Sequence, residues 1–283
     1  MDGMTILVTG GTGNIGRRLV DRLLATTTDF RVLVRRAGTE QHLPPGTAVV
    51  HGDLRDPGGL ATALRSVDRV FLLWPSLRPD GVEDLAATLA HAGVRHVVYV
   101  SALHVTDDNR DGVWGAVEQA LIDAGIGHTF LRVSGLATNT LGWATAIRAG
   151  EPVRVPYPLA KRSLIHEADV ADVAAAALTD PEHHIGRSHR LTGPAVISQA
   201  DQVAAIGVAI GRPVQVVAQE PDEARTALAA MAGVAWADQA LAYWASLVDH
   251  PEPVTATVAE ILGRPAHPFE RWAVDHADDF REV

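Results

Sequence analysis

The chain has 283 residues, of which 47% are hydrophobic and 20% charged, and its formal net charge is -10 at pH 7. These values are typical of a globular enzyme, and the negative charge argues against a nucleic-acid partner. No apolar run approaches the ~18 residues that a membrane helix needs, so we expect a cytoplasmic protein without membrane contact. Because the chain contains no cysteine, disulfides, thiolate metal sites and thiol catalysis are excluded.

Short apolar runs alternate with amphipathic segments along the first two thirds of the chain. The runs are continuous rather than alternating, which is typical of strands covered on both faces in a parallel sheet. We predict strands at 5–8, 31–34, 48–50, 70–73, 97–100, 128–133 and 190–192. Helical spacing indicates helices at 15–24, 60–64, 82–92, 114–124 and 168–178. This order predicts an α/β fold: a Rossmann-type, doubly wound parallel sheet.

Two parts of the chain are expected to have different roles. We assign residues 1–133 and 165–193 to a Rossmann domain. Residues 134–164 and 194–283, which are mainly helical in pattern beyond Pro194, would form a smaller C-terminal substrate lobe. In open α/β sheets such a lobe lies over the carboxyl ends of the strands, where ligands bind.

A glycine-rich turn follows the first predicted strand and leads into an amphipathic helix. Its glycines are Gly10, Gly13 and Gly16. Gly10 permits a tight turn, Gly13 leaves room for a pyrophosphate at the backbone, and Gly16 lets the helix pack close to the strand. The free N–H groups at the helix start favour an anion, so we interpret the turn as a dinucleotide site rather than a purely structural one.

The end of the second predicted strand indicates which dinucleotide binds. Enzymes that use NAD usually place a carboxylate there, whereas this chain has Arg35 and Arg36. A guanidinium binds a 2′-phosphate through a forked, charge-assisted contact, which favours NADP(H) as the cofactor. After the third strand, Asp53 has two open interpretations: it lines the adenine edge together with Leu54, or it caps a helix near Asp56.

Several further segments narrow the family. They are Ile6 to Gly16, Val32 to Arg35, Gly52 to Leu54, Val97 to Ser101, Asp169 to Ala174, Leu191 to Pro194 and Ile261 to Pro265. In these segments the chain resembles the NmrA-like group of atypical short-chain dehydrogenases/reductases, which includes NADPH-dependent quinone and azo-dye reductases and non-catalytic regulators.

The resemblance implies where the cofactor lies. Trp74 and Pro75 would end the fourth strand beside it, and Ser101 and Ala102 the fifth. A homodimer is a further expectation at the level of the family. The expected cofactor contacts are Gly10, Thr12, Gly13, Asn14, Ile15, Gly16, Arg35, Arg36, Asp53, Leu54, Trp74, Pro75, Ser101 and Ala102.

The usual tyrosine and lysine of short-chain dehydrogenases act from one helical turn. Tyr157 and Lys161 have the bare spacing, but flanking prolines forbid a helix there, so we reject the pair. The helix that should carry the pair offers Trp114 and Glu118 instead, and neither replaces that chemistry. A conjugated acceptor tolerates this loss, because its charge is delocalised and solvent can protonate it.

Other candidates lie in predicted loops, and each has a plainer alternative. His104 is our candidate catalytic residue, to hydrogen-bond a substrate carbonyl or donate a proton, and the alternative is a solvated loop histidine. Asn139 is a pocket residue or a local cap. Trp114, Trp143 and Tyr157 are further candidate substrate contacts, with core filling as the alternative.

Histidines elsewhere are given structural interpretations. His166 and Glu167 precede Asp169, which we expect to cap or anchor the next helix, so we predict no metal site. We interpret His183 and His184 as part of an exposed turn.

The sequence therefore predicts an NADPH-dependent oxidoreductase that reduces a small conjugated carbonyl or quinone-like compound, with a role in bacterial secondary metabolism. Two alternatives stay open. One is a non-catalytic NADP(H)-sensing regulator, and the other is an isomerase or cyclase on the same fold.

Overall fold

The computed structural model describes residues 5–26 and 28–281, which divide into two compact units. The first unit comprises residues 1–133, 167–191 and 257–263, and the second comprises 134–166, 192–256 and 264–283. Residues 257–263 thus belong to the first unit, although the sequence pattern placed them in the C-terminal lobe. In the described part of the chain, no helix has the length and apolar character needed to cross a membrane.

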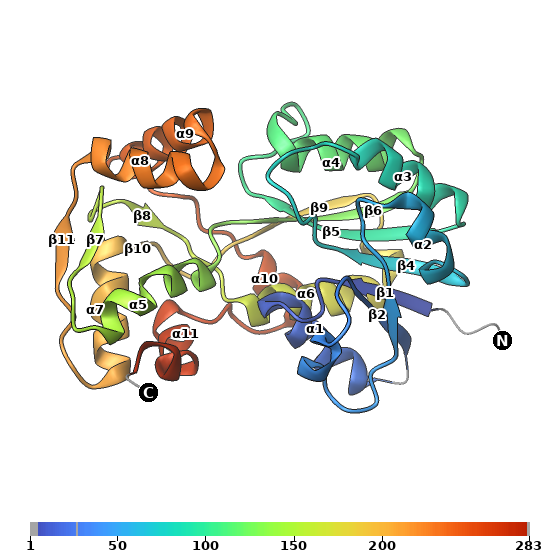
Figure 1. Ribbon diagram of the computed structural model, residues 1–283, viewed down its shortest axis with the longest axis horizontal. Coiled ribbons are helices and arrows are strands. Elements are labelled where there is room, and N and C mark those ends of the chain that lie inside the picture. Colours follow the sequence, from blue (N-terminus) through green and yellow to red (C-terminus); the bar gives the residue numbers. More distant parts are fainter. Residues whose placement is uncertain (1–4, 27, 282–283) are drawn as a thin grey trace. The chain divides into compact units, whose positions relative to one another are not determined.

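A seven-stranded sheet forms the centre of the first unit (Figure 1), and all its strand pairs are parallel. The strand order is β3-β2-β1-β4-β5-β6-β9. The chain thus adds β2 and β3 on one side of β1, and then adds the remaining strands, starting with β4, on its other side. Ligands of such sheets bind where the direction reverses. The strands are β1 (Thr5–Thr9), β2 (Asp29–Val34), β3 (Val49–His51), β4 (Val67–Leu72), β5 (His96–Ala102), β6 (Gly127–Val133) and β9 (Arg187–Leu191).

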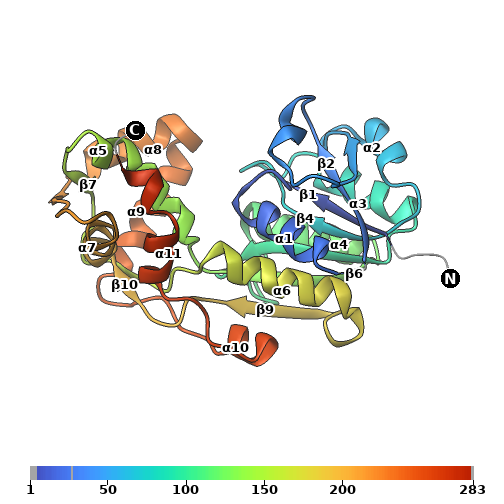
Figure 2. The same cartoon turned by 90° about the horizontal axis from the view of Figure 1, so that it is seen from below.

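Helices cover both faces of this sheet, and the bounds of all but α10, for which no separate helix was predicted, lie within a few residues of the predicted ones. Helices α1 (Asn14–Leu24) and α6 (Glu167–Thr179) pack against each other on one face (Figure 2), and α10 (Thr257–Leu262) contacts α6 and β9. The small, buried alanines of α6 allow this close packing. The opposite face carries α2 (Pro57–Ala63), α3 (Val82–His91) and α4 (Gly112–Asp123). The Rossmann prediction is therefore confirmed.

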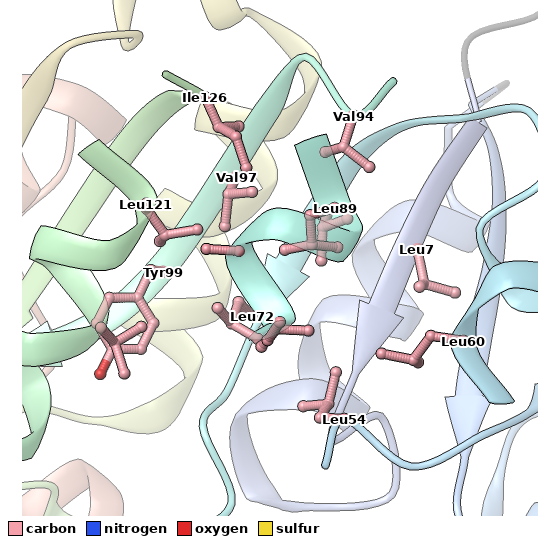
Figure 3. Close-up of a cluster of buried hydrophobic side chains, with 14 of the residues drawn as sticks. Leu7, Leu54, Leu60, Leu72, Leu89, Val94, Val97, Tyr99, Leu121 and Ile126 are labelled. Atoms are coloured by element: carbon pink, nitrogen blue, oxygen red, sulfur yellow. The ribbon is translucent and has the colours of Figure 1, made fainter. Parts of the chain in front are cut away.

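The apolar core under α2, α3 and α4 explains the continuous hydrophobic runs of the sequence (Figure 3). Leu60 and Leu89 extend from the helices towards Leu7, Leu72 and Val97 of the sheet, and all five are at most 1% exposed. Burial on this scale is the main stabilising contribution to such a layer. It also fixes the carboxyl ends of β1, β4 and β5 relative to one another.

The second unit has a core of its own. Trp272 and Phe280 are fully buried there, with Ile147, Val155 and Ile206 packed in the same cluster. Its helices are α5 (Ala144–Arg148), α7 (Gln199–Ile210), α8 (Pro221–Ala232), α9 (Val234–Ser246) and α11 (Phe269–Asp275). Two small sheets pair β7 (Val153–Val155) with β11 (Val216–Ala218) and β8 (Lys161–Arg162) with β10 (Ile197–Ser198). The mainly helical pattern is confirmed, but the sequence did not indicate these short strands.

Candidate functional site

Gly10 and Gly16 have no space for a side chain. A Cβ on Gly16 would lie 2.2 Å from the carbonyl oxygen of Gly10, and a Cβ on Gly10 would lie 2.8 Å from Cδ1 of Leu73. Gly10 also has a φ of +65°, in the left-handed region that favours glycine. The turn is therefore fixed against the end of β4, at the position between β1 and β4 where the order of the strands reverses.

The first turn of α1 is open to an anion. Gly13 is the N-cap and supplies no side-chain cap, and no acidic residue stands in the first turn. Thr12, Gly13 and Asn14 are exposed, while Ile15 turns into the core. Unsatisfied N–H groups at a helix start, with no competing carboxylate, suit the negative charge of a pyrophosphate.

Two free cations follow β2. Arg35 and Arg36 are exposed, and neither guanidinium has a hydrogen bond or ion pair with another described residue. No carboxylate occupies the end of this strand, which is where an NAD-specific site would place one. The arrangement suits an additional phosphate on the adenosine ribose.

Asp53 does not cap the helix that follows it. Asp56 is the N-cap of α2, whereas the Asp53 carboxylate accepts hydrogen bonds from the backbone N–H and the guanidinium of Arg55. The Arg55 side chain holds the pKa of Asp53 below its usual value, and the charge of Arg35 acts in the same direction. The helix-cap interpretation is therefore wrong, and Asp53 with the buried Leu54 stays a candidate for the adenine edge.

The ends of β4 and β5 contribute an indole and a buried hydroxyl. The Trp74 Nε1–H donates to the carbonyl of Arg78 at 2.9 Å, which fixes the indole in the loop that starts with the exposed Pro75. Ser101 is 1% exposed, and its Oγ has no hydrogen-bond partner among the described residues. Ala102 ends β5 beside it. These positions are candidates for the nicotinamide half of the cofactor.

The candidate catalytic residue, His104, packs on α4. Its ring meets Trp114 edge-on, with centroids 5.5 Å apart and an interplanar angle of 87°. Trp114 itself packs against the core of the first unit, so the core-filling alternative accounts for part of its surface. Partial burial of the ring lowers the pKa of His104, while the charge of Glu118 acts in the opposite direction. A lowered pKa makes the imidazole mainly neutral at pH 7, so it suits a hydrogen-bond donor better than an acid.

Sequence reasoning missed a charged network behind this histidine. Glu118 is fully buried and accepts two hydrogen bonds from Arg132, at 3.0 Å from Nε and 2.7 Å from the terminal nitrogen. The same terminal nitrogen of Arg132 lies 2.8 Å from Oδ1 of Asp107. Arg132, which stands among the apolar side chains of Phe130, Leu131 and Val133 in β6, was the signal available in the sequence.

The remaining substrate candidates lie in the second unit. Asn139 is exposed on a short 3-10 helix, Ala137–Trp143, and its side chain makes no cap hydrogen bond within the described residues. Trp143 is half-buried against the core of that unit. Tyr157 lies in the turn between β7 and β8 and shares no helix with Lys161, as expected from the prolines. The roles of all three stay predictions.

Asp169 is buried inside the first turn of α6 rather than at its cap, so the anchoring alternative stays a prediction. The interpretation of His183 and His184 as one exposed turn needs correction. His184 is 8% exposed and lies 2.9 Å from Nε2 of His189 through its Nδ1, so only His183 fits the exposed turn. In the described part of the chain, no group of three or more potential ligands is arranged to hold a metal ion.

Comparison with known proteins identifies the family. The model of an NAD(P)H-binding family matches residues 10–181, which include the glycine turn and the strands that follow it. The chain belongs to this NAD(P)H-binding family. The resemblance that was drawn from the sequence motifs is confirmed at this level.

Two curated relatives match the chain over nearly its whole length. A (4-alkanoyl-5-oxo-2,5-dihydrofuran-3-yl)methyl phosphate reductase of Streptomyces griseus is 38% identical over 97% of this chain and 99% of its own. An NAD(P)H azoreductase of Xenophilus azovorans is 36% identical over 97% of this chain and 99% of its own.

Solved structures share the fold. An NADPH-dependent quinone oxidoreductase from Escherichia coli has a TM-score of 0.78 at 23% identity, over 95% of this chain and 98% of its own. A triphenylmethane reductase from Citrobacter sp. has a TM-score of 0.78 at 19% identity, over 96% of this chain and 99% of its own.

Proposed function

We propose that the protein is an NADPH-dependent reductase that transfers hydride to a small conjugated carbonyl or quinone-like acceptor in bacterial secondary metabolism. The observation that carries the proposal is the full-length match to two reductases at 38% and 36% identity. The match extends through the second unit and beyond the cofactor module, so the coarse class is an NAD(P)H-dependent reductase.

The chemistry of the acceptor follows from the named relatives. The name of the Streptomyces protein describes a dihydrofuran ring with a 5-oxo and a 4-alkanoyl group, and the ring double bond is conjugated with both carbonyls. Such a double bond accepts hydride at the far carbon, because the negative charge spreads over the carbonyl oxygens. Little acid catalysis is then needed, which fits a chain whose α4 carries Trp114 and Glu118 at the expected dyad positions.

The described residues fit an NADP(H) cofactor. The absence of a Cβ on Gly16 lets the start of α1 pack directly against the glycine turn, and that start offers N–H groups to the pyrophosphate. Arg35 and Arg36 supply the cations for the 2′-phosphate. Bound NADPH supplies the hydride. Ser101, whose hydroxyl has no hydrogen-bond partner among the described residues, can then hold the nicotinamide ribose.

His104 is the proposed polar contact of the acceptor. Its neutral imidazole can donate a hydrogen bond to the substrate carbonyl while Trp114 holds the ring in place. The carbonyl oxygen gains charge as hydride arrives, so this hydrogen bond strengthens in the transition state. Solvent completes the reaction by delivering one proton. Asn139, Trp143 and Tyr157 are our candidates for contacts to the remainder of the substrate.

A titration and a stopped-flow experiment test the proposal. Purified protein is titrated with NADPH and NADH, and oxidation of bound NADPH is then followed at 340 nm with a panel of quinones, acyl butenolides, other enones and azo dyes. We expect tighter binding of NADPH and multiple turnovers with at least one conjugated acceptor. Tight binding without oxidation by any acceptor would overturn the reductase proposal and support a cofactor sensor.

A further inference from the structure

The loop between β5 and α4, residues 103–111, carries His104 and is held at both ends. At its start, the Leu103 N–H donates to the carbonyl of Val133 at 2.8 Å, which joins the ends of β5 and β6. At its end, the Arg110 carbonyl lies so close to α4 that a Cβ on Gly115 would be 2.1 Å away. Between these points the Val105 N–H donates to the Ala102 carbonyl at 3.0 Å and the Thr106 N–H donates to the Asn109 carbonyl at 2.9 Å, so these backbone bonds stay within the loop or reach the end of β5. The attachment of the middle of the loop to α4 and β6 therefore depends on side chains.

A chain of charges supplies that attachment. Glu118 is fully buried on α4, and Arg132, which is 4% exposed, pairs with both of its carboxylate oxygens. Arg132 extends past Glu118 to Asp107 at 2.8 Å, and Arg110 approaches Glu118 at 3.6 Å and Asp107 at 3.4 Å. Two cations and two anions thus alternate between the loop, α4 and β6, so the formal charges balance.

A buried ion pair contributes little net stability, because both ions lose their hydration. Such a pair does impose geometry, since only one arrangement satisfies all its donors and acceptors. Glu118 also stands four residues after Trp114, so the carboxylate and the indole that contacts His104 share one face of α4. The ion network and the histidine are therefore attached to the same helix face.

We propose that Glu118 is a positioning residue: through Arg132 and Arg110 it holds Asp107, and thereby fixes loop 103–111 and His104 at the end of β5. The inference rests on the proposed reductase function for its effect on rate. A histidine that must meet a substrate carbonyl within hydrogen-bond reach needs such a fixed loop, because displacements near 1 Å lower rates strongly.

Three variants test the proposal. Glu118→Gln removes the buried charge, and Asp107→Ala removes the loop end of the network at a side chain that is 74% exposed, so folding is preserved in the second variant. Asp68→Ala is the matched control. It breaks an ion pair with Arg95 and a hydrogen bond from the Thr5 N–H at the amino-terminal end of β4, whereas the loop follows the carboxyl-terminal end of β5.

Hydrogen-deuterium exchange measures the loop, and single-turnover oxidation of bound NADPH measures the hydride step. We expect faster exchange of amides 103–111 in Glu118→Gln and Asp107→Ala. We also expect hydride transfer about 10-fold slower in Glu118→Gln, with the Kd for NADPH changed less than about twofold. Asp68→Ala should match the wild type in both measurements.

The outcomes separate the two proposals. Wild-type exchange in loop 103–111 of both variants would overturn the positioning role, and so would a loosened loop with an unchanged hydride-transfer rate. If the wild type oxidises NADPH with no acceptor, the reductase proposal fails by itself, while the exchange data still decide whether Glu118 holds the loop. If Glu118→Gln does not fold, Asp107→Ala alone decides the question.

Discussion

The Cβ position of Gly16 lies 2.2 Å from the carbonyl oxygen of Gly10, so the start of α1 and the end of β1 are in direct backbone contact. The contact brings the first N–H groups of α1 to the end of the strand, and it exists only because residue 16 has no side chain. Gly10 in turn has a Cβ position 2.8 Å from Cδ1 of Leu73, which connects the turn to β4. The shape of the glycine turn therefore depends on close contacts that only residues without a side chain permit.

Gly16→Ala should weaken cofactor binding sharply. A methyl group 2.2 Å from a backbone oxygen forces the turn and the helix apart, which misaligns the N–H groups that we assign to the pyrophosphate. We expect the Kd for NADPH to rise by about 10-fold or more, as for the loss of a charge-assisted hydrogen bond. Isothermal titration calorimetry measures this change.

Gly58→Ala is the control for this substitution. Gly58 lies in α2, and its Cβ position has only an ordinary contact, 3.5 Å from the Asp56 carboxylate. Its NADPH affinity should equal that of the wild type. If Gly16→Ala binds NADPH as tightly as Gly58→Ala does, the turn is not the pyrophosphate site.

Arg35→Asp should change cofactor preference. The guanidinium is exposed and has no hydrogen bond or ion pair with a described residue, so its replacement breaks neither and places a carboxylate where NAD enzymes have one. We expect the Kd for NADPH to rise by about 10- to 100-fold while the Kd for NADH stays equal or falls. Fluorescence titration of both nucleotides gives the ratio.

Arg65→Asp makes the same change of charge at an exposed position beyond α2, at the amino-terminal edge of β4. This variant controls for the change in the net charge of the protein. Its Kd values for NADPH and NADH should stay close to those of the wild type. Equal losses for NADPH and NADH in Arg35→Asp would contradict the 2′-phosphate assignment.

The sequence was sufficient for the sheet and the glycine turn because both depend on local pattern. The residues of β1 are all buried, and the run of apolar side chains shows this directly. The strands of the second unit were not predicted, because they leave no local pattern in the sequence. Lys161–Arg162 and Ile197–Ser198 are too short to show a period, and their pairing joins segments far apart in the chain.

Charged side chains in the site were the least predictable part. We interpreted Asp53 either as a contact at the adenine edge or as a helix cap, but in the structure its carboxylate pairs with Arg55, two residues away. Glu118 was dismissed as a substitute for the usual dyad. Its actual contact, Arg132, lies on strand β6, and no spacing rule connects a helix position with a strand position. Such pairs become visible only when the sheet has placed them.

Tyr99→Phe should stabilise the protein. Tyr99 is 0% exposed on β5, packs edge-on to Phe130 and has a hydroxyl without a hydrogen-bond partner among the described residues (Figure 3). An unsatisfied buried hydroxyl costs about 1–3 kcal/mol, so its removal should raise the free energy of unfolding by about 1 kcal/mol. Urea unfolding followed by circular dichroism measures the change.

Thr129→Val provides the opposite case on the adjacent strand. The Thr129 hydroxyl donates to the carbonyl of His184 at 2.8 Å and contacts His96 Nε2 at 2.8 Å. Its loss leaves both groups buried without that partner, so stability should fall. A loss of stability in Tyr99→Phe comparable to that in Thr129→Val would show that the Tyr99 hydroxyl has a partner in solution.

His96 should make the fold sensitive to acid. It is 1% exposed, and because Thr129 donates its proton to His184, the His96 Nε2 must be the donor towards Thr129. The proton acceptor, Nδ1, is then buried without a partner among the described residues. Burial lowers the pKa of His96 to about 4, and the positive charge of Arg69 acts in the same direction.

The sign of the pH effect follows from this lowered pKa. Above pH 6.5 the histidine is neutral in both states, whereas between pH 6.5 and about 4 only the unfolded chain takes up the proton. Stability therefore falls as pH falls through this window, by about 3 kcal/mol from His96 alone.

Urea unfolding at several pH values from 7.5 to 4.5 should show this loss of stability. His96→Gln should reduce the slope of the unfolding free energy against pH, whereas His91→Gln on the exposed face of α3 should leave that slope unchanged. An identical slope in His96→Gln and the wild type would mean that another group governs acid unfolding, and His189, whose pKa burial also lowers to about 4, would be the next residue to replace.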